Sequence, residues 1–313
     1  MPWNKYLSAL LALLGIVCLL PSCGDDDTPP TKSVPPGTNW ISRTSGTDGQ
    51  LNDIVWSGSQ FVVICESGAV LTSLDGLTWT ETTIPTMQYP NAIACSDDLL
   101  VVVCGNGKIM TSPDGTTWTE RTNPTGSSFS GLARSDTLFA AVGGSGTILT
   151  SSDGITWTER TSGVTCYLTD VAWSGSVFVA VIGDYMCDSV LTSEDGISWS
   201  VHALSFGEGL YGVIWAGSQF VTVGHGGEIF TSPDGVAWTQ RADFVDPSST
   251  LSGLAWSGSI IVAVGAYGRI LTSTDGVNWT ARTSGTTVGL SSVAWSGERF
   301  VAVGSGGTII SSP

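Results

Sequence analysis

Two aspartates, Asp53 and Asp170, occupy equivalent places in a pattern that recurs through the chain. Each stands three residues before a marker position, which is Trp56 in the first copy and Trp173 in the fourth. If the copies surround a channel, the two carboxyl groups lie near its mouth on roughly opposite sides. Facing carboxylates can hydrolyse a glycosidic bond by acid–base catalysis when the gap between them suits the reaction. The alternative is that both are solvated polar caps at the start of a strand.

A second group of residues that could recognise a ligand departs from the pattern, namely the aromatic side chains of the loops. Five tyrosines follow residue 23: Tyr89, Tyr167, Tyr185, Tyr211 and Tyr267. They share their loops, which lead into a first strand or join a second strand to a third, with His225, Met87, Phe129, Met186, Phe206 and Phe244. In a four-stranded meander both loop types emerge on one face, and tyrosine is enriched at interfaces. The loops therefore predict a ligand-binding face; the alternative is local packing of loop positions that have drifted.

The elements that must position these residues are marked by a repeated phrase, Ser-x-Asp-Gly-x-x-Trp. Whole copies end at Trp79, Trp118, Trp157, Trp199, Trp238 and Trp279, and a severed copy begins at Ser312 and resumes from Gly37 to Trp40. Counted from Trp40, successive tryptophans lie 39, 39, 39, 42, 39 and 41 residues apart. This period is typical of a solenoid, a propeller or an array. The phrase itself should form a turn, in which Asp accepts backbone N–H groups and Gly adopts positive φ.

Each period contains four short runs of strand-forming residues separated by Gly-rich turns. In the fourth period the predicted strands are residues 168–173, 177–182, 190–193 and 198–203. No sustained helical periodicity follows residue 23, so helices should be nearly absent. Seven periods of four strands predict an all-β, seven-bladed β-propeller over residues 37–313. The severed phrase predicts that the N-terminal strand, residues 37–45, closes the last blade and so removes the open sheet edges of a linear array.

The repeated phrase resembles the Asp-box of the BNR-type propellers, and the whole repeat is similar to bacterial propellers related to the photosystem II assembly factor. The resemblance covers residues 37–313, although one residue of the common Asp-box is missing between Asp and Gly. It implies the propeller fold, and it adds a role as an assembly factor for an envelope or membrane complex. Because one architecture serves many unrelated functions, the fold transfers more safely than the function.

The N-terminus has the features of an export segment. Residues 1–22 contain Lys5, an apolar run and the sequence Leu20-Pro21-Ser22, which together with Cys23 resembles the cleavage box of bacterial lipoproteins. This predicts a signal peptide over 1–22 and lipidation of Cys23; ordinary signal cleavage is the alternative. Residues 23–36 are rich in Asp and Pro, a composition typical of a disordered tether.

The acidic stretch that directly follows Cys23 resembles the surface-export signal of Bacteroidetes lipoproteins. We therefore expect a protein that is lipid-anchored in the bacterial outer membrane and displayed on the cell surface. An outer-membrane lipoprotein that faces the periplasm is the alternative. In either case the acyl chains on Cys23 would be its contact with the membrane.

Two of the remaining cysteines, Cys166 and Cys187, lie in loops of the fourth repeat that share a face. An oxidising compartment permits a disulfide between them, and two free thiols are the alternative. Cys65 and Cys104 occupy equivalent positions in neighbouring repeats, which are too far apart to bridge. We expect these two, and Cys95, to be small buried residues.

The balance of charge excludes several classes of partner. The chain has 27 acidic and 11 basic residues, and its formal net charge is −16. No basic patch would neutralise phosphates, so nucleic acid is not an expected partner. No His/Cys cluster has the spacing of metal ligands, and the Gly-rich strings lack the following helix of a phosphate-binding loop. We expect neither a metal nor a cofactor.

Taken together, the residues favour a non-catalytic, monomeric lipoprotein that binds a protein or a glycan through its tyrosine-bearing face. A glycoside hydrolase that uses Asp53 and Asp170 is the catalytic alternative, and an assembly factor is the third. The tether would enter at Gly37, on the face opposite the tyrosines. The tyrosine-bearing face should therefore point away from the membrane.

Overall fold

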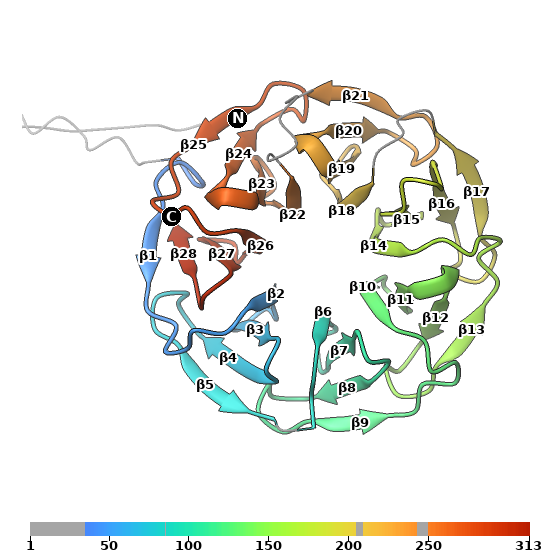
Figure 1. The fold of residues 1–313 in the computed structure, drawn as a ribbon, viewed down its shortest axis with the longest axis horizontal. Helices are drawn as coiled ribbons and strands as arrows, with labels where there is room; N and C mark the ends of the chain where they lie inside the picture. Colours follow the sequence, from blue (N-terminus) through green and yellow to red (C-terminus); the bar gives the residue numbers. More distant parts are fainter. Residues whose placement is uncertain (1–34, 85, 205–208, 243–249) are drawn as a thin grey trace, which may run out of the picture. The chain divides into compact units, whose positions relative to one another are not determined.

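The computed structural model describes residues 35–84, 86–204, 209–242 and 250–313. The predicted signal peptide, Cys23, most of the tether, Phe206 and Phe244 lie outside these residues. The unit Val34–Pro313 is compact and contains seven four-stranded antiparallel sheets around a central axis (Figure 1). The prediction of an all-β, seven-bladed propeller is thus confirmed. Within the described ranges, no helix has the length and apolar character needed to cross a membrane.

Each blade is a meander, and in blades one to six the four strands run in chain order from the centre of the ring outward. The innermost strands are β2 (Leu51–Trp56), β6 (Pro90–Cys95), β10 (Phe129–Arg134), β14 (Leu168–Trp173), β18 (Leu210–Trp215), β22 (Leu251–Trp256) and β26 (Leu290–Trp295). The second strands are β3 (Phe61–Cys65), β7 (Leu100–Cys104), β11 (Phe139–Gly143), β15 (Phe178–Ile182), β19 (Phe220–Gly224), β23 (Ile261–Gly265) and β27 (Phe300–Gly304).

The outer half of each blade completes the sheet. The third strands are β4 (Ala69–Ser73), β8 (Ile109–Ser112), β12 (Ile148–Ser151), β16 (Ser189–Ser193), β20 (Ile229–Ser232), β24 (Ile270–Ser273) and β28 (Ile309–Ser312). The outermost strands are β5 (Thr80–Thr83), β9 (Thr119–Arg121), β13 (Thr158–Arg160), β17 (Ser200–Ala203), β21 (Thr239–Ala242), β25 (Thr280–Arg282) and, in blade seven, β1 (Ile41–Arg43). Short 3₁₀ turns join second to third strands in blades three, five and six: η1 (Gly144–Gly146), η2 (His225–Gly227) and η4 (Ala266–Gly268).

The last blade is shared between the two ends of the described chain. Strand β1 pairs antiparallel with β28, so that Ile41 lies opposite Ser311 and Arg43 lies opposite Ile309 (Figure 1). The Arg43 guanidinium adds a hydrogen bond from Nε to Ser311 Oγ at 2.8 Å. The prediction that an N-terminal strand closes the ring is therefore confirmed.

The hydrophobic core lies between neighbouring blades rather than within one sheet. One cluster joins Leu51, Phe61 and Val63 of blade one to Val301 and Val303 of blade seven. Every residue of every second strand is buried, and none of the seven strands alternates polar with apolar residues. A strand with a blade packed on each face has no solvent side, so its sequence is almost continuously apolar. Thr222 in β19 is polar, and its hydroxyl donates to the Gly212 carbonyl at 2.8 Å.

The free cysteines follow this packing only in part. The Cys65 and Cys104 side chains end their second strands and are buried. The prediction that Cys95 is buried was wrong, because its side chain is only half-buried at the end of β6. Its thiol donates to the Trp56 carbonyl at 3.6 Å. The carbonyl belongs to blade one, so this thiol contacts the preceding blade.

The repeated phrase forms a turn between the third and fourth strands, and blade one illustrates it. Ser73 Oγ accepts the Gly76 N–H at 2.8 Å, and Asp75 Oδ1 accepts the N–H groups of Leu77 at 2.8 Å and Thr78 at 3.0 Å. Hydrogen bonds from Thr78 and Leu77 lower the pKa of Asp75 to about 2. Gly76 has φ +69°, a conformation that glycine adopts without steric cost. The phrase is thus occupied in building the blade.

Candidate functional site

The wall of the central channel is shaped by a β-bulge that recurs in all seven innermost strands. In β2 the register against β3 shifts between Leu51 and Asp53, which leaves Asn52 without a partner in the ladder. The same shift occurs in the other six blades. A bulge re-aims the side chain of its extra residue, and here that side chain lies at the channel.

In blades one to four the bulge residue is hydrogen-bonded to a backbone carbonyl of the next blade. The four bonds run from Asn52 Nδ2 to Pro90 O (2.7 Å), from Asn91 Nδ2 to Phe129 O (2.7 Å), from Ser130 Oγ to Leu168 O, and from Thr169 Oγ1 to Leu210 O (2.6 Å). Each acceptor is the first residue of the next innermost strand. These polar side chains therefore join blades one to five along the channel.

Asp53 and Asp170 directly follow bulge residues and also reach the next blade. Asp53 Oδ1 accepts the Ile54 N–H at 2.8 Å and the Ser292 hydroxyl at 2.6 Å, while Oδ2 accepts the Ile93 N–H at 2.9 Å. Asp170 repeats the arrangement, accepting the N–H groups of Val171 at 2.8 Å and Val213 at 2.9 Å.

These contacts give the two aspartates a role that the sequence analysis missed. Instead of forming solvated caps, the carboxylates bond blade one to blade two and blade four to blade five. Where the third residue of an innermost strand is glycine, the backbone of the next blade packs directly against it. A Cβ on Gly131 would lie only 2.6 Å from the Cα of Asp170. Carboxylate bridges and close backbone approach are thus two ways of joining neighbouring inner strands.

The two carboxyl groups share a cavity of about 280 Å³ in the channel. Burial raises the pKa of Asp53 to about 6, against the opposing effect of its hydrogen bonds from Ser292, Ile93 and Ile54. Burial also raises the pKa of Asp170 to about 7, and the negative charge of Asp53 adds to this rise. Such values suit acid–base chemistry, but each carboxylate oxygen already accepts a backbone N–H.

No cluster of three or more His, Cys, Asp and Glu side chains among the described residues could hold a metal ion. His202 pairs with Thr192, its Nε2 lying 2.8 Å from Oγ1. At the equivalent place in other blades an arginine bonds the third strand, as Arg160 Nε donates to Thr150 Oγ1 at 2.8 Å. These basic side chains are therefore engaged along the outer strands.

The tyrosines lie on one face of the ring, which we call the loop face. It carries the loops between second and third strands and the loops that lead into innermost strands; the opposite face, with the repeated turns, is the turn face. Four tyrosine side chains are well exposed: Tyr89 (55%), Tyr167 (41%), Tyr185 (51%) and Tyr267 (70%). Tyr211 was expected in a loop, and this was wrong: it lies within β18, where it occupies the bulge position.

Three of the predicted binding residues come together across blades four and five. The hydroxyl groups of Tyr185 and Tyr211 lie 3.2 Å apart, and the Tyr185 ring meets the His225 ring edge-on with centroids separated by 5.6 Å. We call these three residues the aromatic cluster. Tyr89 and Tyr267 belong to the loops of blades two and six and do not join it.

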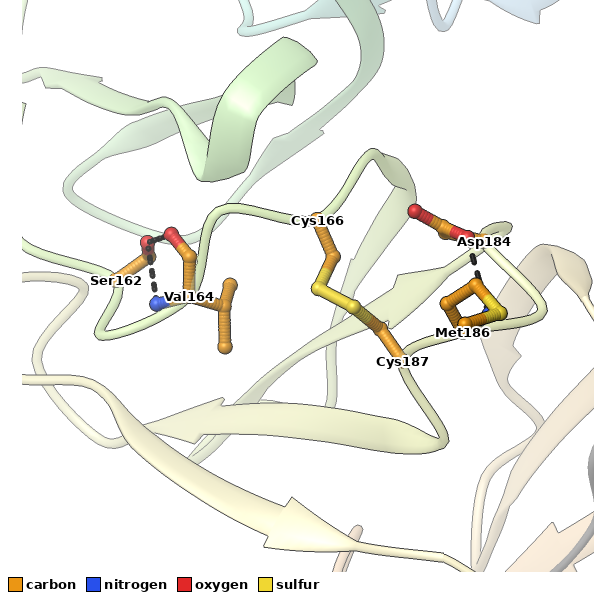
Figure 2. The surroundings of a disulfide bond; sticks show 6 residues. All are labelled: Ser162, Val164, Cys166, Asp184, Met186 and Cys187. Carbon is orange, nitrogen blue, oxygen red and sulfur yellow. Dashed lines mark hydrogen bonds between the residues drawn. A yellow bond between two sulfur atoms is a disulfide. The ribbon is translucent and has the colours of Figure 1, made fainter.

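The loop that presents Tyr185 is held by a disulfide (Figure 2). Cys187 is bonded to Cys166, which lies in the segment leading into β14. Within the loop, Asp184 Oδ1 accepts the Met186 N–H at 3.0 Å, and the Met186 side chain is 90% exposed. The Gly183 N–H donates to the Tyr167 carbonyl at 3.1 Å. Covalent and hydrogen bonds therefore hold both loops of blade four to each other.

A groove that was not predicted from the sequence lies beside this loop, between blades three and four. Its volume is about 830 Å³, and its lining includes Arg160, Val164, the disulfide, Met186 and Asp188. The signal for it was the three-residue insertion in the fourth period, which lengthens the loop that carries Met186. Met186 lines this groove and directly follows Tyr185 in the chain, so the groove and the aromatic cluster share one loop.

Two residues expected on the binding face are buried instead. The side chains of Met87 and Phe129 have no exposed surface. Met87 packs in the core between blades one and two, and Phe129 is the first residue of β10 and packs against blade two. Both side chains pack between neighbouring blades, so neither residue belongs to the surface of the loop face.

Backbone conformation sets two exposed tyrosines apart. Tyr89 has φ +54° and Tyr267 has φ +56°. The left-handed region costs a residue with a side chain roughly 1–2 kcal/mol. The residue equivalent to Tyr267 in blade five is Gly226, which adopts φ +66° without that cost. Strain of this kind persists where the surroundings impose it, and it is found at functional sites.

No protein-family profile matches the chain, and no curated protein matches it in sequence. Solved structures with this fold include YCF48 bound to D1 peptide, with a TM-score of 0.73, 17% identity, and 90% of this chain and 99% of that chain covered. A catalytically inactive variant of virginiamycin B lyase from Staphylococcus aureus with quinupristin gives a TM-score of 0.78, 12% identity, and coverage of 87% and 98%. The WD40 β-propeller domain of Doa1 gives a TM-score of 0.73 and 13% identity, with 88% of this chain and 97% of that chain covered.

These likenesses establish the class of the protein, a seven-bladed β-propeller that resembles YCF48 in fold. One of these structures is a protein bound to a peptide, and another is a lyase with quinupristin. Proteins of such different function share this ring, so the fold leaves the function of this chain open.

We predict that the channel aspartates make stability rise as the pH falls from 8 to about 5. Both carboxyl groups have a pKa above the ordinary value of 3.8, so between about pH 4 and 7 the native state binds protons that the unfolded state does not. Below about pH 4 the sign reverses, because turn aspartates such as Asp75 have a lowered pKa and lose favourable ionised contacts on protonation.

Urea denaturation at pH 8, 6, 5 and 3 measures this profile. The expected gain from pH 8 to 5 is about 1–3 kcal/mol. The double variant Asp53→Asn, Asp170→Asn should be less stable throughout and flat between pH 8 and 5. An equal slope in wild type and double variant would contradict the assignment.

We predict that the disulfide stabilises the native state by constraining the unfolded chain. The two cysteines are 21 residues apart, and closing a loop of that size is worth about 3 kcal/mol. The double variant Cys166→Ser, Cys187→Ser should therefore unfold at lower urea, whereas Cys95→Ser, which removes a free thiol, should lose much less. An unchanged midpoint in the double variant would refute this.

Proposed function

We propose that this protein is a non-catalytic lipoprotein that binds a protein partner through its loop face. The observation that carries the proposal is the aromatic cluster, in which side chains from two blades meet at an exposed surface. Tyrosine combines a large apolar area with a hydroxyl group at low conformational cost, which suits it to interfaces. No residue of the repeated blade pattern requires tyrosine or histidine at these loop positions.

The construction of the surrounding loops supports a binding surface. Ordering a loop on association costs free energy, and a loop that is already fixed avoids much of that cost. The Cys166–Cys187 disulfide and the Asp184 turn fix the segment that carries Tyr185 and Met186. YCF48 has been solved with D1 peptide on the same fold, a precedent for a protein segment as ligand and for an assembly-factor role.

The glycoside-hydrolase alternative depends on Asp53 and Asp170. Their raised pKa values and shared cavity favour it, because a general acid must be protonated near the working pH. Against it, the carboxylates bridge neighbouring blades, and their oxygens accept backbone N–H groups. A carboxylate that must keep these bonds is poorly placed to exchange a proton with a substrate. A glycan bound without hydrolysis at the loop face remains a distinct outcome of the experiments below.

We further propose that acyl chains on Cys23 anchor the protein in the bacterial outer membrane, facing the cell exterior. The proposal rests on the sequence of residues 1–27, with its apolar run, its cysteine and the acidic residues that follow. Strand β1 follows Gly37 and Trp40, which belong to the severed copy of the repeated turn on the turn face. A tether joined there would leave the loop face directed away from the membrane.

We predict that a protein partner will be captured by wild-type protein and lost on mutation of the aromatic cluster. Full-length protein in detergent is used to isolate partners from solubilised envelopes, in parallel with the double variant Tyr185→Ala, Tyr211→Ala. Capture should fall at least tenfold in the double variant, since burial of an interface tyrosine is commonly worth more than 1 kcal/mol. Unchanged thermal unfolding shows that the ring is intact.

The matched control is Leu74→Ala, which removes an apolar side chain that is 77% exposed on the turn face. It should capture as much partner as wild type. Equal capture by the cluster variant would overturn the proposed surface. Binding on a glycan array with no protein captured would favour the glycan, and turnover of a glycoside that Asp53→Asn, Asp170→Asn abolishes would favour the hydrolase.

We predict that Cys23→Ser abolishes lipidation. Cells labelled with a radioactive fatty acid should label the wild type and not the variant, and the variant should leave the membrane fraction. Protease added to intact cells should degrade the wild type if it is displayed externally. Label retained by Cys23→Ser would exclude Cys23 as the acylated residue, and protection of the wild type from protease would indicate the periplasmic orientation.

A further inference from the structure

We propose that the loop face around Tyr185 recognises cationic side chains, so that the partner presents a lysine- or arginine-bearing segment. This inference deepens the proposed function and rests on it. It joins three observations: the charge of the loop face, the aromatic surfaces that stand among those charges, and the groove that leads up to them.

Acidic side chains outnumber basic ones in the described loops of this face. The carboxylates are Asp48, Glu66, Asp184, Asp188 and Glu228, and the basic residues are Lys108 and Arg269. Lys108 is already paired, with its Nζ 2.8 Å from Glu120 Oε2. An anionic partner would therefore meet repulsion at this face, whereas a cationic one would be attracted.

Three of these carboxylates flank the aromatic cluster. Asp184 and Asp188 lie on either side of Tyr185 and Met186 in the same six-residue loop, and Glu228 follows His225 by three residues. Asp184 uses one oxygen for the Met186 N–H, and Glu228 has its own contacts, including Gln240 Nε2 at 3.4 Å from Oε1. A carboxylate has about four acceptor sites, so Asp184 has room for a further cationic donor. Oε2 of Glu228 is buried, so Glu228 contributes its negative charge rather than a direct contact.

The aromatic rings supply the second half of the recognition. A lysine ammonium or arginine guanidinium placed over a tyrosine face is attracted by the ring electrons, by about 0.5–1 kcal/mol where exposed and more where water is excluded. Tyr185 and Tyr167 are both half-exposed and belong to the two loops that the disulfide joins. Rings and carboxylates on a fixed frame favour a cation over a neutral polar group.

The groove between blades three and four fits the chain that would carry such cations. Its volume is about 830 Å³, and its largely polar lining includes three apolar side chains, Val164, Ile182 and Met186. Its charged residues are Glu159, Asp188 and Arg160, and Arg160 already donates through Nε to Thr150. Because Met186 lines the groove and is the chain neighbour of Tyr185, an extended segment in the groove would have its next residues near the aromatic cluster.

Two synthetic peptides test the inference, Ac-(Gly-Arg)₃-NH₂ and its citrulline counterpart, which has the same shape without the charge. Binding to detergent-solubilised full-length protein is measured by calorimetry at 50 and 300 mM salt. We expect the arginine peptide to bind at least tenfold more tightly than the citrulline peptide, and to weaken severalfold at the higher salt.

Variants separate a specific site from general attraction to an acidic protein. Tyr185→Ala should weaken the arginine peptide about tenfold without any change in net charge. Asp188→Asn should weaken it severalfold, whereas Asp98→Asn, which removes one exposed carboxylate from the turn face, should not. Equal effects of the two Asn variants, or no effect of Tyr185→Ala, would overturn the inference.

The outcome can be distinguished from failure of the proposed function. If the cluster variant Tyr185→Ala, Tyr211→Ala loses the captured partner while the arginine and citrulline peptides bind alike, the loop face binds a protein that is not cationic. If the arginine peptide binds as predicted and no partner depends on the cluster, the cation site stands and the proposed protein-binding function fails.

Discussion

The ring depends on how each innermost strand is joined to the next one. Backbone pairing in a propeller stops at the edge of each sheet, so neighbouring blades adhere through buried apolar side chains and through bonds that cross the gap. The recurring bulge provides one such bond by turning a polar side chain out of the ladder, as Asn52 and Thr169 show. Asp53 and Asp170 provide another, because each accepts an N–H from the next blade. Most polar side chains of the channel wall described above are therefore used in bonds between neighbouring blades.

The two faces of the ring differ in how many of their side chains the fold requires. The turn face repeats one hydrogen-bonded turn, and its Asp, Gly and Ser are occupied by that turn in blade after blade. The side chains of the loop face do not form this turn, so they can differ between blades. Tyr211 combines a structural position with a variable side chain. It occupies a bulge position at the channel, and its hydroxyl contacts that of Tyr185 in the preceding blade.

The sequence predicted the architecture well because each of its signals is local and repeated. Tryptophan spacing determined the number of blades, and the phrase severed between Ser312 and Gly37 identified the strand that closes the ring. Contacts between blades could not be predicted in the same way. The bulge shifts the register by one residue without any change in the pattern, so the bridges made by Asp53 and Asp170 were missed. Tyr185, Tyr211 and His225 were each placed on the correct face, but their meeting depends on the angle between blades four and five. Met87 and Phe129 lie in or beside loops by sequence, and only the path of the chain shows that they are buried.

The features of the loop face share an energetic property. An exposed tyrosine at φ +56°, as at Tyr267, gains nothing for the isolated fold and costs roughly 1–2 kcal/mol relative to a glycine there. Met186, at 90% exposure, likewise leaves apolar surface in water at the tip of a loop that a disulfide holds in place. Burial of apolar area contributes about 25 cal/mol per Å². A partner that covers these side chains would therefore gain the free energy of burial that the free protein lacks. Carboxylates beside the same side chains would then select which partner does so, because a cation gains from them and an anion loses.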